Sequence, residues 1–265
     1  MSSPTFKSNL SITHVGTATA VLELDGINLL TDPFFSPAGT EFKIQEGVTL
    51  KIDDTPALKL EDLPVIDAVL LSHEDHPDNL DSYGRQLLDG RVVFTTMDGA
   101  SNLAPRRGVR GFKPWESADV TLGGKPFRVT ATPCKHVPGG ECTGFVLTTP
   151  SFGEADGLPN AIYFTGDTVY IEELAKLRDM FHISVAVMNL GNAHAPMFDP
   201  PMNITMDGKQ AARLARDIGA DVVVPIHFDS WNHFMEKGDD LRKVFEEEGL
   251  GNVVWLEPGV STKVI

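Results

Sequence analysis

The sequence predicts an α/β fold in which β-sheets are covered by helices. The chain has 265 residues, of which 42% are hydrophobic and 22% charged, a composition typical of a soluble globular protein with a sizeable core. Short apolar runs rich in β-branched residues alternate with segments of helical periodicity, as in sheets joined by crossover helices. The length lies between one and two domains of about 150 residues each, and α/β folds of this size often form one unit. We therefore predict a single domain over residues 1–265.

Strands dominate the predicted first part of the chain. Leu10 to Val15 and Ala20 to Leu24 are predicted strands, and the turn at Asp25 and Gly26 leads into a third strand, Ile27 to Thr31. The first run that is apolar enough for a fully buried strand is Asp67 to Ser72. Further strands are predicted at residues 91–96, 127–132, 143–148, 161–165, 185–189, 221–226 and 252–256.

Three helices and two long loops complete the predicted pattern. The helices are predicted from Asn79 to Leu88 with Gly90 as the stop, from a Thr205 cap to Ile218, and from Asp239 to Glu248. The loops span Pro33 to Pro64 and Gly191 to Asn203. Loops of this length are often lids or binding loops, and a plain surface excursion is the alternative.

Charge and composition exclude several classes of function. The chain has 37 acidic and 22 basic side chains, a formal net charge of −15, so no cationic field favours nucleic acid or anionic membranes. The N-terminal MSSPTFKSNL has no apolar signal region, and no apolar run reaches the ~18 residues of a membrane span. Cys134 and Cys142 are too few for a disulfide scaffold and have no CxxC spacing, so we interpret them as ordinary residues. We predict a cytoplasmic protein.

Histidine and aspartate side chains follow four of the predicted strands. His73 follows the strand that ends at Ser72, His136 the strand that ends near Pro133, Asp167 the strand that ends at Thr165, and His227 the strand that ends at Ile226. In α/β folds the carboxyl ends of strands are where ligands bind, because loops converge there over a rigid sheet. A single histidine in such a place is more often structural, but four such positions together predict a site.

The densest group of these side chains is the segment Ser72 to Asp81, SHEDHPDNLD. Imidazole and carboxylate groups are ligands for zinc, manganese or iron, and several of them in one tight loop can span two ions. The alternative is a charged helix N-terminus capped by Asp78 or Asn79. Capping accounts for one acidic residue and leaves His73 and His76 unexplained.

With these motifs the sequence resembles the metallo-β-lactamase superfamily, and within it the branch of the ascorbate phosphate lactonases and the N-acyl-phosphatidylethanolamine phospholipase D-like hydrolases. The resemblance covers nearly the whole chain. It rests on the order and spacing of these motifs: ITHVG at residues 12–16, LTDP at 30–33, SHEDHPDNLD at 72–81, TPCKH at 132–136, FTGDT at 164–168 and VPIH at 224–227.

The loop at residues 72–81 departs from the family pattern H-x-H-x-D-H. With one residue inserted after His73, the residues that match are His73, His76 and Asp78, and Asn79 stands where a histidine is expected. Without an insertion, the matches are His73, Asp75 and His76, and Leu71 replaces the first histidine. We prefer the first register because it keeps Leu80 and Asp81 in phase. In either register one ligand of the usual two-metal set is altered.

The resemblance also implies roles for the residues at the strand ends. Asp167 would bridge two ions, His136 would complete one site with the loop histidines, and His227 would complete the other. Asp32 would orient the ligands from behind, although a structural aspartate in a Thr-Asp-Pro turn is the alternative. Thr17 replaces a second histidine of the opening motif, and Asn203 stands where related hydrolases often have histidine.

The metal chemistry can be argued from the residues alone. A divalent ion lowers the pKa of a bound water from ~15.7 to roughly 7, which yields hydroxide at neutral pH, and it polarises a carbonyl or phosphoryl oxygen. Asp78 or Asp75 is then the candidate catalytic carboxylate, which accepts a proton and passes it to the leaving group. The chain has no G-x-S-x-G motif, phosphate-binding loop or dinucleotide fingerprint.

Five further residues neighbour the proposed ligands in the sequence and are candidates for the substrate pocket, with packing or surface roles as the alternative. They are Tyr170, His194, Phe228, Trp231 and His233. His14 and His182 are predicted to be structural.

We therefore predict an αβ/βα four-layer sandwich, in which two mixed sheets are flanked by helices, as the resemblance implies. The predicted metal ligands are His73, Asp75, His76, Asp78, His136, Asp167 and His227, which would hold one or two Zn²⁺ ions, with Mn²⁺ or Fe²⁺ as alternatives. The predicted activity is hydrolysis of a carbonyl bond in a small molecule, a lactam, cyclic amide or lactone. A phosphodiesterase and a non-catalytic metal or ligand binder are the alternatives, and a homo-oligomer is left open.

Overall fold

Two seven-stranded sheets form the centre of the protein in a computed structural model that describes residues 5–195 and 197–265. In the first sheet the strand order is β18-β1-β2-β3-β6-β7-β8. These strands are β1 (Leu10–Gly16), β2 (Thr19–Leu24), β3 (Ile27–Thr31), β6 (Ala68–Leu70), β7 (Val92–Thr96), β8 (Val109–Phe112) and β18 (Thr262–Lys263). Strands β1 to β3 pair antiparallel, whereas β3, β6, β7 and β8 pair parallel, so the sheet is mixed.

The second sheet has the order β17-β14-β13-β11-β10-β9, with β12 paired to β13. Its strands are β9 (Ser117–Leu122), β10 (Lys125–Pro133), β11 (Thr143–Thr148), β12 (Glu154–Ala155), β13 (Leu158–Phe164), β14 (His182–Asn189) and β17 (Val222–Ile226). The pairs from β9 to β13 are antiparallel, and β13, β14 and β17 are parallel. This sheet is therefore mixed as well.

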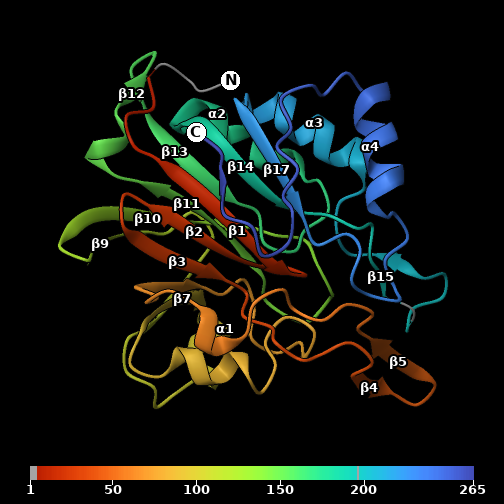
Figure 1. The fold of residues 1–265 in the computed structure, drawn as a ribbon. Coiled ribbons are helices and arrows are strands. Elements are labelled where there is room, and N and C mark those ends of the chain that lie inside the picture. The colour runs from red at the N-terminus through yellow and green to blue at the C-terminus, as the bar shows by residue number, and fades with distance from the viewer. Residues whose placement is uncertain (1–4, 196) are drawn as a thin grey trace.

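The two sheets pack face to face and helices cover their outer faces (Figure 1). Leu22 of the first sheet and Phe145 and Val187 of the second belong to one buried cluster between the sheets. The helices are α1 (Met97–Asn102), α2 (Leu177–Met180), α3 (Gly208–Ile218) and α4 (Gly238–Glu247), and the 3-10 helices are η1 (Leu60–Asp62), η2 (Gly84–Leu88), η3 (Pro150–Phe152) and η4 (Glu172–Lys176).

Each outer face has its own apolar cluster. Leu214 of α3 and Phe245 of α4 pack on the second sheet, and Leu88 of η2 packs on the first. The predicted αβ/βα sandwich is therefore confirmed.

Two predicted elements are wrong. The helix from Asn79 to Leu88 is absent, and only the 3-10 helix Gly84–Leu88 forms there. Side-chain hydrogen bonds direct the chain instead: Asn79 Nδ2 donates to the His73 carbonyl, 2.8 Å away, and Asp81 Oδ1 accepts from the Gly84 N–H at 2.7 Å. The strand at residues 252–256 is reduced to one bridge between Val253 and Val223.

The cap of the third helix differs from the prediction. Helix α3 begins after Asp207, whose carboxylate accepts from the Gln210 N–H, while the Thr205 hydroxyl donates to the Leu190 carbonyl. The reason is that Asp207 lies directly before the first helical turn and Thr205 is already committed to the loop after β14.

Both predicted long loops contain short hairpins. Strands β4 (Glu41–Gln45) and β5 (Val48–Lys51) form one, and β15 (His194–Ala195) and β16 (Met202–Asn203) form the other. The two hairpins lie on the same side of the molecule in Figure 1. Short apolar segments such as β8, β9, β12 and β18 and the helix α1 had no clear sequence pattern and were not predicted. No helix in residues 5–195 and 197–265 is long and apolar enough to cross a bilayer.

Substitution of Asp81 tests which contacts hold the loop after β6 in place. Its buried carboxylate accepts from the Phe35 N–H, the Ser36 hydroxyl and the Gly84 N–H at 3.1, 2.6 and 2.7 Å. Asp81→Ala leaves these three donors without their acceptor, so we expect the free energy of unfolding to fall by about 3 kcal/mol.

Urea denaturation measures this loss. Asp119→Ala is the matched control, because Asp119 is an exposed carboxylate that pairs with Arg128 on the neighbouring strand. Equal effects of the two substitutions would contradict a special role of Asp81.

Candidate metal centre

The predicted strand-end residues meet at one edge of the sandwich. His73 follows β6 of the first sheet, while His136, Asp167 and His227 follow β10, β13 and β17 of the second. Since the carboxyl ends of these strands converge, loops that are distant in the sequence bring their side chains together.

Three histidines form the tightest group. His73 Nε2 lies 3.1 Å from His76 Nδ1, and His136 Nε2 lies 3.4 Å from the same atom. The three donor atoms all lie within 4.8 Å of one another. Three imidazoles at this separation are the arrangement expected of a site for a transition-metal ion such as zinc.

Hydrogen bonds behind two of these rings leave their Nε2 atoms free for a ligand role. His136 Nδ1 lies 2.8 Å from the Ile204 carbonyl, which can only accept, so Nδ1 carries the proton. Ser72 Oγ donates to Asp32 Oδ2 at 2.8 Å and is left to accept from His73 Nδ1 at 2.9 Å. In metal sites such partners fix the tautomer and direct the ring.

Asp32 lies where the resemblance places a residue that acts from behind the ligands. It is fully buried, and its Oδ1 accepts from the Ser72 N–H at 2.7 Å. Burial raises the pKa of Asp32 to about 8, against the effect of the Ser72 hydrogen bonds. Its backbone φ is +28°, an unusual conformation that brings the side chain to the loop after β6.

Asp167 stands between histidines on several sides. Asn189 Nδ2 donates to its Oδ1 at 2.7 Å, and His227 Nδ1 lies 3.8 Å from that oxygen. Burial acts to raise the pKa of Asp167, but attraction to His227, His136 and His73 outweighs burial. The pKa of Asp167 is therefore well below its ordinary value, and the carboxylate is ionised at neutral pH. An ionised carboxylate beside several imidazoles is a metal-ligand arrangement.

His227 is held in a conformation that few non-glycine residues adopt. Its φ is +63°, its N–H donates to the Thr17 carbonyl at 3.0 Å, and its Nδ1 lies 3.2 Å from the Leu190 carbonyl. The left-handed backbone costs about 1–3 kcal/mol and turns the ring back toward Asp167 at the end of β17. Such strain is common at functional sites.

Burial favours the uncharged form of two candidate ligands, His73 and His136. It lowers the pKa of His73, with His76 and His136 adding to the effect, and it lowers the pKa of His136 as well. Burial also lowers the pKa of His233 to about 4. Neutral imidazoles have the free lone pair that metal coordination needs.

The structure separates the two registers of the loop. Asp78 lines the cavity in front of the histidines, whereas Asp75 is exposed, outside the cavity and near Gly140. Asn79 is buried and donates to the His73 carbonyl rather than facing the cavity. The loop therefore follows the register with an inserted residue, and Asp75 is not placed among the candidate ligands or beside the cavity.

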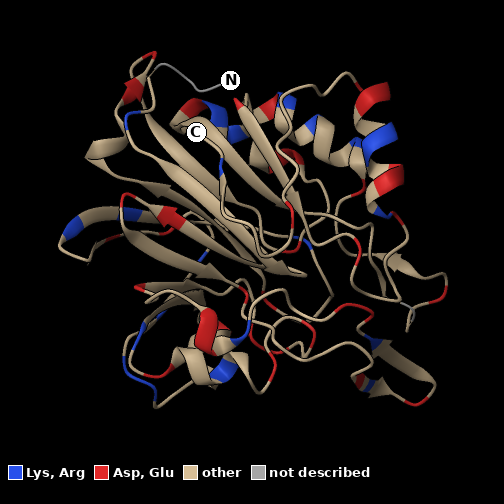
Figure 2. Cartoon of the chain, viewed as in Figure 1, with Lys and Arg blue, Asp and Glu red and all other residues tan. Residues whose placement is uncertain are grey.

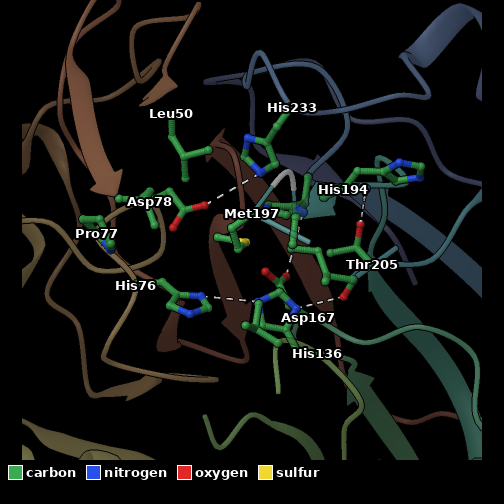
Figure 3. Close-up of a pocket in the computed structure, with 16 residues that line it drawn as sticks. Leu50, His76, Pro77, Asp78, His136, Asp167, His194, Met197, Thr205 and His233 are labelled. Carbon is green, nitrogen blue, oxygen red and sulfur yellow. Dashed lines mark hydrogen bonds and ion pairs between the residues drawn. The ribbon is translucent and has the colours of Figure 1, made fainter. Parts of the chain in front are cut away.

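The cavity in front of the cluster has a volume of about 60 Å³. Its titratable walls are Asp78, Asp167 and the histidines at 76, 136, 194, 227 and 233. Most of the remaining lining is apolar and includes Ile44 of β4, Leu50 of β5, Val137, Met197 and Ile204, while Thr205 adds a hydroxyl. Figure 3 shows Asp78 facing His233 across the cavity, with His76, His136 and Asp167 at its other end.

The predicted pocket residues divide into two groups. His194 and His233 line the cavity. Trp231 is instead fully buried against Phe34, with ring centroids 5.1 Å apart, and Phe228 packs on Trp255. Tyr170 donates to Asp217 on the outer side of the second sheet. These three aromatic residues are therefore packing residues, because the apolar clusters nearby take up their rings.

Other residues near the site carried no motif in the sequence that would have identified them as functional. Cys142 Sγ donates to the Asp167 carbonyl at 3.2 Å and lies 3.6 Å from His73 Nδ1, so it packs behind two candidate ligands rather than in an ordinary loop. Asn189 and Ser72 also contact ligands. Their positions at strand ends were the only available indication. Asn203 pairs with Asn192 and does not line the cavity.

Comparison with known families agrees with this site. Residues 27–228 match the model of the beta-lactamase superfamily domain, and the chain belongs to this family. It is 25% identical to a UPF0173 metal-dependent hydrolase of Methanopyrus kandleri over 95% of this chain and 99% of that protein. A protein of the same name from Pyrobaculum aerophilum is 21% identical over 96% and 100% of the two chains.

Solved structures show the same fold. An isothiocyanate hydrolase from Delia radicum gut bacteria has a TM-score of 0.75 at 22% identity, covering 95% of this chain and 98% of that one. Igni18, a metallo hydrolase from Ignicoccus hospitalis, has a TM-score of 0.73 at 20% identity, covering 96% and 98%. The diiron β-hydroxylase CmlA of Streptomyces venezuelae also shares the fold, at a TM-score of 0.63 and 15% identity over 98% of this chain and 55% of that one. One fold thus carries different reactions, so it does not by itself assign this one.

The lactonase and phospholipase D-like branch of the superfamily stays a prediction. The same holds for the single domain, the ligand set and the identity of the metal.

Ser72 provides a test of the centre that leaves every proposed ligand in place. Ser72→Ala removes the hydroxyl between Asp32 and His73, so the His73 ring loses the acceptor that directs it. We expect zinc affinity to fall by about 10- to 100-fold.

Competition with a chromophoric chelator measures the affinity. Ser184→Ala is the matched control, since Ser184 is also a fully buried serine but lies near the opposite end of β14. Unchanged affinity in Ser72→Ala would show that His73 is not held through this hydroxyl.

Proposed function

We propose that this protein is a metal-dependent hydrolase that opens a carbonyl bond in a small uncharged molecule, such as a lactam, cyclic amide or lactone. The observation that carries the proposal is the group of His73, His76 and His136, whose donor atoms lie within 4.8 Å of one another. Two of these histidines, His76 and His136, line a cavity. The membership of the chain in the beta-lactamase superfamily and the names of its curated relatives support it.

The residues of the centre fit a divalent ion. His73, His76 and His136 would hold it through neutral ring nitrogens, with Asp167 close by as an ionised carboxylate. Zinc is the first choice for such donors, with Mn²⁺ or Fe²⁺ as alternatives. When bound, the ion supplies Lewis acidity and lowers the pKa of a coordinated water from ~15.7 to roughly 7.

Asp78 is the proposed catalytic carboxylate. It projects from the loop after β6 into the cavity, between the histidine cluster and His233 (Figure 3). In that position its oxygens can accept the proton of an attacking water and deliver it to the leaving nitrogen or oxygen. Asp75 is exposed and has no place in this step.

The walls of the cavity favour an uncharged substrate. Among its described lining residues there is no Lys or Arg, while Ile44, Leu50 and Met197 offer apolar contact. Lys and Arg positions occur on several helices, strands and loops of the ribbon in Figure 2. A phosphodiester carries a negative charge and would find no cationic side chain here beyond the bound metal. We therefore rank phosphodiester hydrolysis second, and we propose neither nucleic acid nor membrane as a partner.

Removal of single ligands tests the metal centre. His136→Ala leaves two histidines in the cluster, and Asp167→Ala removes the carboxylate that contacts His227, so we expect each variant to lose bound metal and activity. Metal content of the purified proteins is measured by inductively coupled plasma mass spectrometry. His182→Ala is the control, because His182 pairs with Asp221 at the other end of the second sheet. Normal metal content in both site variants would overturn the assignment.

A substrate panel tests the reaction. The zinc-loaded protein is assayed with neutral lactams, neutral lactones, an isothiocyanate and a nitrophenyl phosphodiester; the isothiocyanate is included because of the named activity of one fold relative. We expect turnover of a neutral substrate that is lost with a chelator and restored by zinc. Faster cleavage of the phosphodiester would select the second candidate. Inertness toward all of them despite bound metal would indicate a non-catalytic binder.

A further inference from the structure

A second group of donor atoms lies beside the three-histidine cluster in the same cavity. Asp78 comes from the loop after β6, Asp167 and His227 follow β13 and β17, and His233 lies in the loop between β17 and α4. His227 Nδ1 is 3.8 Å from Asp167 Oδ1, and His233 Nε2 is 3.9 Å from Asp78 Oδ2. The group is thus two pairs, more open than the first cluster.

His233 is a buried polar group without a partner. Only 9% of its side chain is exposed, its Nδ1 has no hydrogen bond, and its Nε2 has only Asp78 at 3.9 Å, beyond hydrogen-bond length. A buried polar atom left unpaired costs about 1–3 kcal/mol, so such groups in folded proteins call for an explanation.

The ring of His233 is held in place by its neighbours. Its centroid lies 5.0 Å from the Phe234 ring and 6.0 Å from the buried Trp231 ring. The His233 carbonyl accepts from the His194 N–H of β15 at 3.3 Å. The surrounding packing therefore presents a neutral imidazole to the cavity and gives its ring nitrogens no hydrogen-bond partner.

We propose that His233 is a metal ligand, and that it completes the second ion position that the resemblance implies for Asp78, Asp167 and His227. The inference rests on the proposed metal centre and extends it. Two ligands of one ion, each roughly 2.0–2.2 Å from it, stand roughly 3–4.4 Å apart, and the 3.9 Å between His233 Nε2 and Asp78 Oδ2 falls in that interval. His227 would coordinate through Nε2, because its Nδ1 faces the Leu190 carbonyl. Two imidazoles with two carboxylates suit zinc, iron or manganese.

Asp167 links the two sites. Its carboxylate interacts with His73 and His136 of the first cluster and with His227 of the second group. The second site would therefore share one wall with the first, and its ion would offset the charge of Asp78 and Asp167 inside the cavity.

The proposal also accounts for the altered loop. Asn79, which stands where the resemblance places a histidine, turns its amide away to the His73 carbonyl and offers the cavity no nitrogen lone pair. His233 faces the same space from the opposite wall and supplies an imidazole there (Figure 3). The altered ligand is thus replaced from another loop.

The test measures metal stoichiometry, which does not depend on knowing the substrate. Protein stripped with a chelator is titrated with Co²⁺, and bound metal is followed by visible absorption and by mass spectrometry after desalting. We expect the unaltered chain to bind two equivalents. His233→Ala should bind one equivalent normally and the second at least about 100-fold more weakly, beyond the effect of losing a residue behind a ligand.

His194→Ala is the matched control, because His194 lines the same cavity and is not a proposed ligand. It should bind two equivalents. His233→Asn covers the case in which the alanine variant does not fold, and circular dichroism checks folding of all three.

The outcomes distinguish the inference from the proposed function. Two normal equivalents in both His233 variants would show that His233 is not a ligand. A single equivalent in the unaltered chain would overturn the second site and leave the three-histidine centre intact. No bound metal at all would overturn the proposed function itself.

Discussion

The structure of the candidate site depends on one buried carboxylate, Asp32. Its Oδ1 and Oδ2 accept from the backbone and the hydroxyl of Ser72, and its own N–H donates to the Leu70 carbonyl of β6. Through Ser72 it directs His73, and through the backbone it ties the end of β3 to the loop that carries the candidate metal ligands. A buried acidic side chain with unmet oxygens is costly, so these hydrogen bonds favour the observed path of the loop and hold His73 in place.

The loop after β6 shows how polar side chains replace regular structure. Asp81 accepts three hydrogen bonds, and buried Glu74 pairs with Arg85 at 2.9 Å. Because these polar groups already have hydrogen-bond partners, they do not cap a helix, and the chain turns toward the cavity instead. At the opposite wall, a strained left-handed backbone at His227 positions that side chain. The packed strands on either side hold the backbone in this conformation. The hydrogen bonds of Asp81 stabilise the loop that they position, whereas His227 is positioned at the expense of local stability.

The charge of the protein and the character of the cavity point to the same class of substrate. The formal net charge is −15, and the described lining of the cavity contains carboxylates and imidazoles but no Lys or Arg. Bound cations would neutralise the carboxylates, which leaves apolar walls from β4, β5 and the segment around Met197 to contact the substrate. An uncharged molecule with a polar bond near the metal fits this arrangement better than an anion, since anions are repelled by the surrounding field.

Local patterns in the chain were enough to predict the α/β class, most of the buried strands and the four strand ends that carry His73, His136, Asp167 and His227, because apolar periodicity and residue chemistry are local properties. They left open whether Asp75 or Asp78 faces the site, and they misplaced Trp231 and the helix at residues 79–88. Those questions were decided only by the tertiary structure. The contacts responsible, such as Asp81 with Phe35 and His233 with Asp78, join segments far apart in the chain, and no local pattern encodes which distant partner a polar side chain will meet.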